Sequence, residues 1–195
     1  MKNRPKYRKI IEAAVQVIAE NGFHGSQVSK IAKAAGVADG TIYLYFKNKE
    51  DILVTVFQEK MGQFIEKIKE ETERKTSADE KLYTLIEMHF SQLSNNPHLA
   101  IVTQLELRQS NYELRRQINQ VLKPYLNIID QIVQEGMEQK LFREQLMIPV
   151  VRQMIFGTLD EIVTNWVMKE RKYDLMEQVP QVHQLLLDGI SGIKK

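Results

Sequence analysis

The chain has 195 residues, of which 43% are hydrophobic and 27% charged, with a formal net charge of +2 and no cysteine. This length suits a small module joined to a larger body, and the lack of cysteine excludes disulfides, thiolate catalysis and sulfur-ligated metals. No apolar run approaches the roughly 18 residues of a membrane span, and the N-terminus lacks the apolar segment of a secretory signal. We therefore expect a cytoplasmic protein.

Residues suited to catalysis or metal binding are not grouped in the sequence. The four histidines never stand four residues apart, and there is no glycine-rich phosphate loop or nucleophile elbow. His89 lies on an apolar helical stripe, which favours a core histidine over a functional one. We therefore expect that the protein is not an enzyme and binds no metal and no cofactor.

The first 50 residues read as three short helices. One has an apolar face that includes Ile10, Ala14 and Val17, and it should end at Asn21-Gly22. The next covers residues 27–35 with apolar residues at helical spacing, and Gly36 after it can adopt a left-handed turn. A third helix within residues 37–49 is rich in Tyr, Thr and Lys. The order helix, glycine turn, helix predicts a helix-turn-helix.

The third helix of this module carries groups suited to DNA. Hydroxyl and ammonium donors can bind phosphate oxygens, and small residues at the front of the helix would allow close approach to base edges. The predicted phosphate contacts are Thr41, Tyr43, Tyr45, Lys47 and Lys49, and the predicted base-edge residues are Ala38, Asp39, Gly40 and Leu44. Asp39 has two equally good interpretations, a cytosine acceptor or a helix N-terminal acid.

Charge is divided in the way that this interpretation requires. Residues 1–50 hold nine Lys and Arg against four acidic residues, whereas residues 51–195 hold 18 against 21. A basic head on a slightly acidic body favours nucleic acid as a partner of the head, because neutralisation of phosphates is a local effect. The basic cluster before Ile10, which includes Lys2 and Arg4, is either a DNA-binding arm or a disordered tail.

From about Arg8 to Leu53 the chain resembles the DNA-binding domain of TetR-family bacterial transcription regulators. The motifs that carry this resemblance are Ala13-Ala14, Gly22-Phe23, Val28, Ile31-Ala32, Ala35-Gly36-Val37, Gly40-Thr41-Ile42-Tyr43 and Tyr45-Phe46-x-x-Lys49-Glu50. The resemblance implies base contacts from residues 39–44, phosphate contacts from Thr41, Tyr43, Tyr45 and Lys49, and support from Ser26, Gln27 and Lys30. Gln27 departs from the small hydroxyl residue that is more usual in the family.

The rest of the chain also predicts helices, without a strand pattern. Asn48 should begin a long helix, since Glu50 and Asp51 follow in its first turn. Ser77-x-x-Glu80 and Ser110-x-x-Glu113 fit capping boxes, and Asn96-Pro97 places a cap before a first-turn proline. Each of these three motifs should begin a further helix.

Two C-terminal segments are too apolar to face water alone. Residues 150–167 are apolar nearly all round, and residues 179–193 carry a second apolar stripe. Two helices from each of two subunits would bury these surfaces in a four-helix interface, which predicts a homodimer. Asp160 and Glu161 interrupt the first segment, where exposure or an inter-subunit contact is favoured over binding of a polar ligand group.

Residues 101–111 and 153–161 resemble the ligand-binding domain of FadR-type regulators of fatty-acid degradation in Gram-positive bacteria. The resemblance implies a long-chain acyl-CoA as the effector that releases the repressor from DNA. An acyl chain needs an apolar tunnel, and the CoA phosphates need cations at its mouth. The candidate wall residues are Phe64, Phe90, Leu105, Tyr125, Ile129, Val133, Met154, Leu159 and Trp166, and the candidate mouth residues are Arg108, Arg115, Arg116 and Lys123.

The sequence thus predicts an all-α homodimer. Residues 1–50 would form a three-helix helix-turn-helix DNA-binding domain, and residues 51–195 a helical ligand-binding and dimerisation domain. The favoured function is an acyl-CoA-responsive repressor with a palindromic double-stranded DNA operator and no membrane partner. Two alternatives stay open: an efflux-pump repressor that responds to a hydrophobic drug, and a lipid-binding protein without DNA binding.

Overall fold

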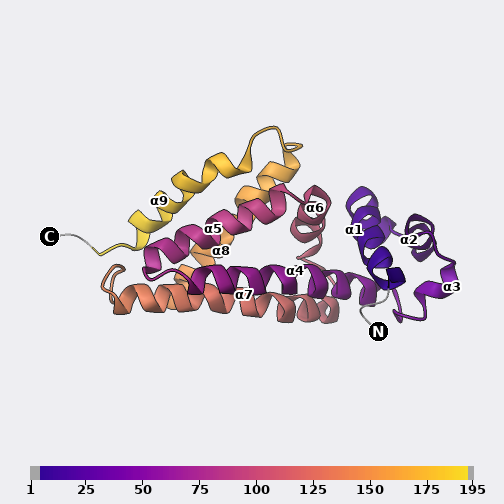
Figure 1. The fold of residues 1–195 in the computed structure, drawn as a ribbon, viewed down its shortest axis with the longest axis horizontal. Helices are drawn as coiled ribbons and strands as arrows, with labels where there is room; N and C mark the ends of the chain where they lie inside the picture. Colours follow the sequence, from indigo (N-terminus) through magenta and orange to yellow (C-terminus); the bar gives the residue numbers. More distant parts are fainter. Residues whose placement is uncertain (1–4, 193–195) are drawn as a thin grey trace. The chain divides into compact units, whose positions relative to one another are not determined.

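The computed structural model describes residues 5–192, which form helices joined by short connections (Figure 1). The helices are α1 (Pro5–Gly25), α2 (Val28–Ala35), α3 (Asp39–Ile42), α4 (Lys49–Glu73), α5 (Ala78–Ser94), α6 (Pro97–Glu106), α7 (Tyr112–Glu138), α8 (Ile148–Met168), the 3-10 helix η1 (Leu175–Gln178) and α9 (Val179–Ile190). Within the described range the β pairing is an isolated antiparallel bridge between Phe142 and Ser191. The all-α prediction is confirmed.

The helices divide into two compact units that do not follow chain order. The head unit contains the described residues up to 62 together with 97–121, and the body unit contains 63–96 together with the described residues from 122 onward. The head unit therefore includes α1, α2, α3, α6 and the first parts of α4 and α7. The predicted domain boundary after residue 50 falls in the first turn of α4.

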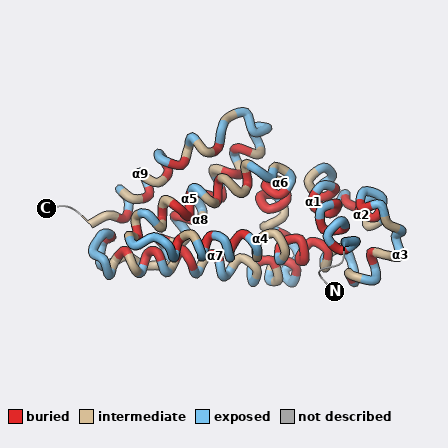
Figure 2. The backbone as a smooth tube through the Cα atoms, viewed as in Figure 1, coloured by how far each residue is buried: buried red, intermediate tan, exposed pale blue. Residues whose placement is uncertain are grey.

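The head unit is built around α1, which packs against α2 and α6. One side of α1 is buried, as Figure 2 shows along the helix. Ile10 and Ala14 on its apolar stripe are fully buried. The helical path breaks at Gly22, whose φ of 68° and ψ of 162° lie outside the helical region and favour glycine. The first helix therefore breaks at the predicted Asn21-Gly22, although helical turns continue to Gly25.

Two predicted helix starts are confirmed by their hydrogen bonds. At α4, Asn48 Oδ1 accepts a hydrogen bond from the Asp51 N–H at 2.8 Å. At α5, Ser77 and Glu80 form a capping box. The Ser77 hydroxyl accepts a hydrogen bond from the Asp79 N–H at 3.2 Å, and the Glu80 carboxylate accepts one from the Ser77 N–H at 3.3 Å. Both caps satisfy backbone N–H groups that the first helical turn leaves unpaired. Helix α6 begins at Pro97, in agreement with the Asn96-Pro97 signal.

The capping box expected at Ser110 is wrong. Helix α7 begins at Tyr112, and Asn111 Oδ1 accepts the Leu114 N–H at 3.0 Å. Glu113 instead binds Arg116 through two hydrogen bonds of 2.8 and 3.1 Å. Asn is as good an N-cap residue as Ser. Because the helix begins one residue later than predicted, the Glu113 side chain does not cap it and pairs with Arg116, three residues further along.

In the body unit, α5 packs against α8, η1 and α9. Close approach of the chain after α7 depends on Gly136, since a Cβ there would lie 2.0 Å from Phe142 Cδ2. The Phe142 ring therefore covers the last turns of α7, and the neighbouring Arg143 N–H donates to the carbonyl of Ile190 at 2.9 Å. No helix of the described part is long and apolar enough to cross a membrane.

Candidate DNA interface and effector site

The turn between α2 and α3 has the left-handed geometry that was predicted at Gly36. Gly36 adopts φ 66° and ψ 38°, in the left-handed region, and ends α2. Its N–H donates to the Lys33 carbonyl at 3.1 Å, and the Val37 N–H donates to the Ala32 carbonyl at 3.0 Å. These bonds satisfy the last carbonyls of α2 and turn the chain toward α3.

Helix α3 is shorter than the predicted third helix, because regular helix covers only Asp39–Ile42 and turns follow it. Ile42 is fully buried and Phe46 nearly so, and they anchor this segment in the head unit. Tyr43 and Leu44 point outward, with 59% and 75% of their surface exposed. Two buried anchors therefore hold exposed residues in a fixed place.

The remaining DNA candidates fall into exposed and half-buried positions. Thr41 and Tyr45 are half-buried, and the Tyr45 ring lies 5.9 Å from the ring of Tyr7. Tyr7 in turn has its pKa raised to about 12 by burial and by the nearby Glu59, so it stays protonated. The exposed candidates are Gln27, Lys30, Ala38, Asp39, Gly40 and Lys47.

Two of the predicted DNA residues have internal roles that the sequence did not reveal. Ser26 is 1% exposed, and its hydroxyl bonds the carbonyls of Gly22 at 2.7 Å and Val17 at 3.1 Å, so its side chain can support the DNA-binding helices only from inside the head unit. Lys49 Nζ donates to the carbonyls of Phe23 at 2.9 Å and His24 at 3.3 Å and lies over the Phe23 ring. A phosphate contact from Lys49 stays a prediction, with one ammonium hydrogen left to make it.

Glu106, at the end of α6, binds the same Phe23 peptide group as Lys49. Its Oε1 accepts the Phe23 N–H at 2.8 Å, while its Oε2 accepts from Gln109. The Phe23 peptide is therefore held at its N–H by Glu106 and at its carbonyl by Lys49. No sequence signal joins residues so far apart in the chain, and only the packing of α6 on α1 brings them together.

Aromatic side chains gather in the centre of the body unit. Phe64 on α4 stacks on Tyr125 on α7 at 6.2 Å, and Phe156 on α8 meets Tyr125 edge-on at 6.1 Å. Of the predicted wall, Phe64, Phe90, Tyr125, Ile129, Val133, Leu159 and Trp166 are buried. Leu105 and Met154 are 50% and 38% exposed in the single chain, and their place in the wall stays a prediction.

Arg115 and Arg116, two of the four predicted cations, have partners near the start of α7. Arg116 is paired with Glu113, whose pKa it lowers to about 2 through its hydrogen bonds. Arg115 donates to the Gln109 carbonyl at 2.9 Å and lies over the Tyr112 ring. Arg108 and Lys123 are exposed. Arg115 and Arg116 therefore serve in part to fix the first turns of α7.

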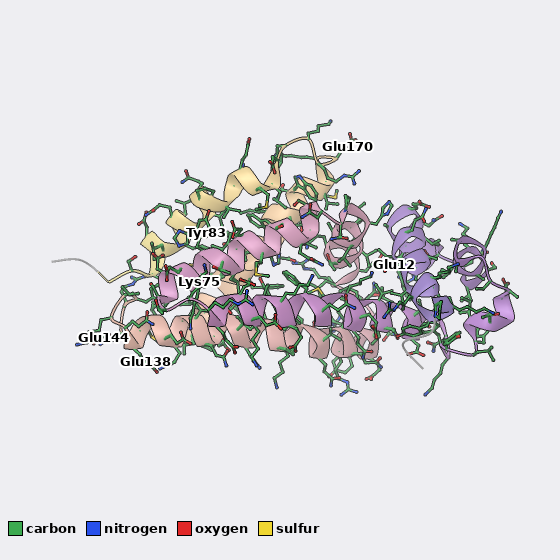
Figure 3. All side chains as sticks on the ribbon, viewed as in Figure 1. Glu12, Lys75, Tyr83, Glu138, Glu144 and Glu170 are labelled. Carbon is green, nitrogen blue, oxygen red and sulfur yellow. The ribbon has the colours of Figure 1, made fainter. Side chains whose placement is uncertain are left out.

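Three further polar groups of the body unit are buried or hydrogen-bonded, namely Asp160, His89 and His183. Asp160 is only 3% exposed in the single chain, which contradicts the expectation of surface exposure or an inter-subunit contact. His89 is buried, as expected of a core histidine, yet its Nε2 has no hydrogen-bond partner among the described residues. His183 Nε2 lies 2.8 Å from Asp79 Oδ1, and these two residues connect α9 to α5. The His183 ring also meets the ring of Tyr83 edge-on, and Figure 3 labels Tyr83.

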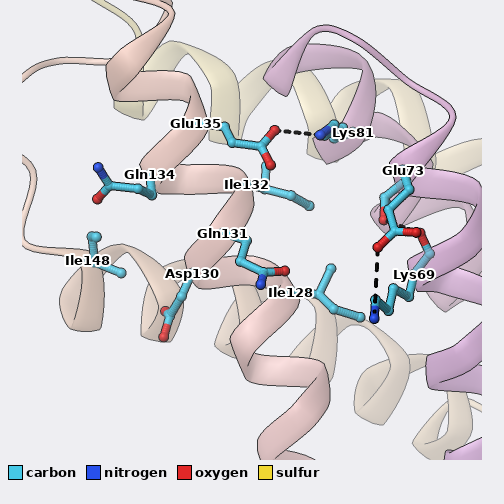
Figure 4. A pocket seen from close by; sticks show the side chains of 11 residues that line it. Lys69, Glu73, Lys81, Ile128, Asp130, Gln131, Ile132, Gln134, Glu135 and Ile148 are labelled. Carbon is cyan, nitrogen blue, oxygen red and sulfur yellow. Dashed lines mark hydrogen bonds and ion pairs between the residues drawn. The ribbon is translucent and has the colours of Figure 1, made fainter.

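A groove of about 530 Å³ opens elsewhere on the body unit, between α4, α5, α7 and the start of α8 (Figure 4). Its cations are already paired, Lys81 with Glu135 and Lys69 with Glu73. None of the predicted wall or mouth residues lines it. Within the described part, no group of His, Asp and Glu is arranged to hold a metal ion.

A glycine-linked helix pair that exposes Tyr43 and Leu44, with Lys30 and Lys47 exposed in the same segment, is the arrangement of a helix-turn-helix DNA-binding domain. Two family models match the chain, "Bacterial regulatory proteins, tetR family" over residues 10–56 and "YsiA-like protein, C-terminal region" over residues 57–189. The chain belongs to the TetR family of bacterial regulatory proteins.

Individual relatives extend this assignment over the whole chain. The fatty acid metabolism regulator protein of Bacillus subtilis is 62% identical over 187 residues, which cover 96% of each chain. The fatty acid degradation regulator FadR of Bacillus halodurans is 63% identical with a TM-score of 0.91, over 94% of this chain and 98% of that one. FadR of Bacillus subtilis in complex with stearoyl-CoA is 61% identical with a TM-score of 0.92, over 94% and 99%. The predicted resemblance to both groups of regulators is confirmed, and these relatives are regulators, not enzymes.

Proposed function

We propose that this protein represses fatty-acid degradation genes and is released from a palindromic operator by long-chain acyl-CoA. The observation that carries the proposal is the likeness to the FadR structure solved with stearoyl-CoA, at 61% identity over 94% of this chain. A regulator of chromosomal operators works beside the chromosome, so the protein acts in the bacterial cytoplasm.

The exposed residues around α3 are the proposed DNA interface. Tyr43, Thr41 and Lys47 supply hydroxyl and ammonium donors for phosphates, whereas Gly40 and Leu44 lie where base edges can be met. Gln27 and Lys30 support them from the start of α2, although Lys30 Nζ also donates to Asn21 Oδ1 at 2.9 Å. Lys2 and Arg4 of the predicted arm lie outside the described residues.

An apolar face on α8 and α9 supports the proposed homodimer. Met154 and Val150 on α8 and Leu185 on α9 are exposed, and a Cβ at Gly189 would lie 3.8 Å from the Met154 methyl carbon. The two helices therefore meet beside a shared apolar surface, which water disfavours. Burial of this surface by a second copy would give a two-fold dimer, whose recognition segments should lie roughly 34–36 Å apart, one turn of DNA.

The effector in this proposal enters the body unit, where the aromatic cluster supplies apolar surroundings for an acyl chain. Each buried CH₂ adds roughly 0.8 kcal/mol, so affinity should rise with chain length until the site is full. Ligand and DNA should oppose each other with a coupling of about 1–3 kcal/mol. By linkage, operator DNA weakens acyl-CoA binding by the same factor.

Titration of an operator complex with free CoA, a short acyl-CoA and a long acyl-CoA tests the effector. We expect release by the long acyl-CoA at the lowest concentration and no release by free CoA. Equal release by all three, or none at saturation, would contradict the acyl-CoA assignment and leave DNA binding intact. Release by a hydrophobic drug alone would favour the efflux-pump alternative.

The DNA interface is tested by salt dependence. Lys47→Ala should weaken binding to all sequences and reduce the slope of log K against log salt by about 1, since one phosphate contact is lost. Lys169→Ala removes an exposed lysine from the body unit and serves as the matched control. An unchanged slope for Lys47→Ala would remove this residue from the phosphate contacts.

A further inference from the structure

His89 on α5 is an imidazole enclosed by aromatic rings in the centre of the body unit. Only 6% of its surface is exposed. The ring centroids of Phe64, Phe90 and Tyr125 lie 6.3, 6.0 and 5.6 Å from its own. Burial lowers the pKa of His89 to about 4, so the ring is neutral near pH 7 and carries one N–H.

The contact with Tyr125 decides which nitrogen carries that hydrogen. Tyr125 Oη lies 2.8 Å from His89 Nδ1, and among the described residues this nitrogen is the hydrogen-bond partner of the hydroxyl. Burial, together with the negative charge of Asp160, raises the pKa of Tyr125, so the hydroxyl keeps its hydrogen. If Nδ1–H donated to the hydroxyl oxygen instead, both the Tyr125 O–H and His89 Nε2 would lack a partner among the described residues. The arrangement that leaves fewer groups unpaired has Tyr125 donating to Nδ1 and the neutral imidazole carrying its own hydrogen on Nε2.

This Nε2–H is a buried donor without an acceptor in the described part of the chain. An unpaired buried donor is costly, and such groups in native proteins usually have a partner that is a bound water or a ligand. The surrounding rings offer no oxygen to this nitrogen. An acceptor brought by the effector would remove the cost, so binding energy would be gained there.

The effector proposed above restricts the choice of acceptor. Its hydrocarbon chain has no acceptor, and its phosphates are charged groups that an enclosure of aromatic rings would desolvate. The thioester carbonyl is a neutral acceptor joined directly to the hydrocarbon chain. We infer that His89 Nε2–H donates a hydrogen bond to the carbonyl oxygen of the bound acyl thioester, and that Tyr125 fixes the tautomer that makes this possible. The inference rests on the proposed function.

A pair of ligands that differ only in this oxygen tests the inference. Calorimetric titration of the full-length protein compares a long acyl-CoA with the S-alkyl-CoA thioether of equal chain length, in which CH₂ replaces the carbonyl. We expect the thioester to bind about 5- to 30-fold more tightly, the range that one hydrogen bond to a buried donor supplies. Equal affinities would overturn the inference and would agree with a bound water as the partner of Nε2.

The variant His89→Phe keeps an aromatic ring and removes the donor. Its preference for the thioester should fall to within about 2-fold, whereas His98→Phe, which changes an exposed histidine on α6, should keep the wild-type preference. Thermal unfolding by circular dichroism checks that both variants are folded. A full thioester preference in His89→Phe would overturn the inference.

Nitrogen-15 NMR of the histidine rings gives a test on the wild-type protein alone. The free protein should show His89 as the Nε2–H tautomer, and the Nε2 proton should shift when the thioester is added but not when the thioether is added. A Nδ1–H tautomer would contradict the assignment. If neither ligand binds while operator DNA still does, the proposed effector is wrong, whereas binding of both ligands with equal affinity rejects only the role of His89.

Discussion

The head unit and the body unit differ in how far their buried polar groups are hydrogen-bonded. In the head, Glu106 accepts the Phe23 N–H, Lys49 donates to the Phe23 carbonyl, and Ser26 bonds the carbonyl of Gly22. In the body, His89 Nε2 and Asp130 Oδ1 are buried without a partner among the described residues. Among the described residues, the buried side-chain atoms without a partner thus lie in the body unit and not in the head unit.

This difference suits the two functions proposed above, DNA binding by the head unit and effector binding by the body unit. A recognition segment must present Tyr43 and Leu44 in one geometry before DNA arrives, and a fully hydrogen-bonded frame provides that geometry. An effector site instead gains affinity from groups that stay unsatisfied until the ligand binds. The predictions below test both halves of the comparison, beginning with the largest effect.

The largest effect concerns the neutral, buried His89. Its pKa of about 4 lies below the ordinary value of 6.5, so between these values the unfolded chain binds a proton that the folded protein excludes. The free energy of unfolding should therefore fall as pH falls from about 6.5 to 4, by up to about 3 kcal/mol for this group. Urea unfolding of the wild type and of His89→Phe across this pH range gives the free energy of unfolding against pH for each protein. The difference between the two curves is the contribution of His89. Parallel curves would show that the imidazole is not held neutral.

A smaller effect is expected in the head unit from Glu106→Ala. The change removes the acceptor of the Phe23 N–H and should lower the free energy of unfolding by about 2 kcal/mol. Operator affinity should fall as well, because the Phe23 peptide joins α1 to the helix-turn-helix. Glu106→Gln keeps a side-chain oxygen and serves as the control. Equal losses for Ala and Gln would mean that the charge of Glu106, and not the hydrogen bond, is what matters.

The smallest effect separates the true cap of α7 from the one that the sequence suggested. Asn111→Ala should destabilise the protein by about 1 kcal/mol, the usual loss for an N-cap, and Ser110→Ala by less than about 0.5 kcal/mol. Ser77→Ala at α5 provides a reference of similar size to Asn111→Ala. Thermal unfolding of the three variants is sufficient to rank them. A larger loss at Ser110 than at Asn111 would reverse the assignment.

Local signals predicted the helices well, because they depend on neighbouring residues. Gly36 takes the left-handed turn that the pattern required, and Asn48 and Ser77 cap the helices that they precede. The failure at Ser110 has the same origin: two adjacent residues, Ser110 and Asn111, can both cap, and the local pattern does not choose between them. The length of α3 was overestimated because the anchors Ile42 and Phe46 are spaced as in a helix, although turns link them.

The sequence by itself determined the all-helical fold, the glycine turn of the helix-turn-helix and the family, because periodicity, caps and short motifs act over a few residues. Only the tertiary structure decided the role of individual polar side chains. It turned Ser26 inward, bound Lys49 to Phe23, buried Asp160 and left His89 Nε2 without an acceptor. Lys49 and His89 contact residues far away in the chain, and Ser26 bonds carbonyls four and nine residues before it. A pattern along the chain carries no information about which donor meets which acceptor in space.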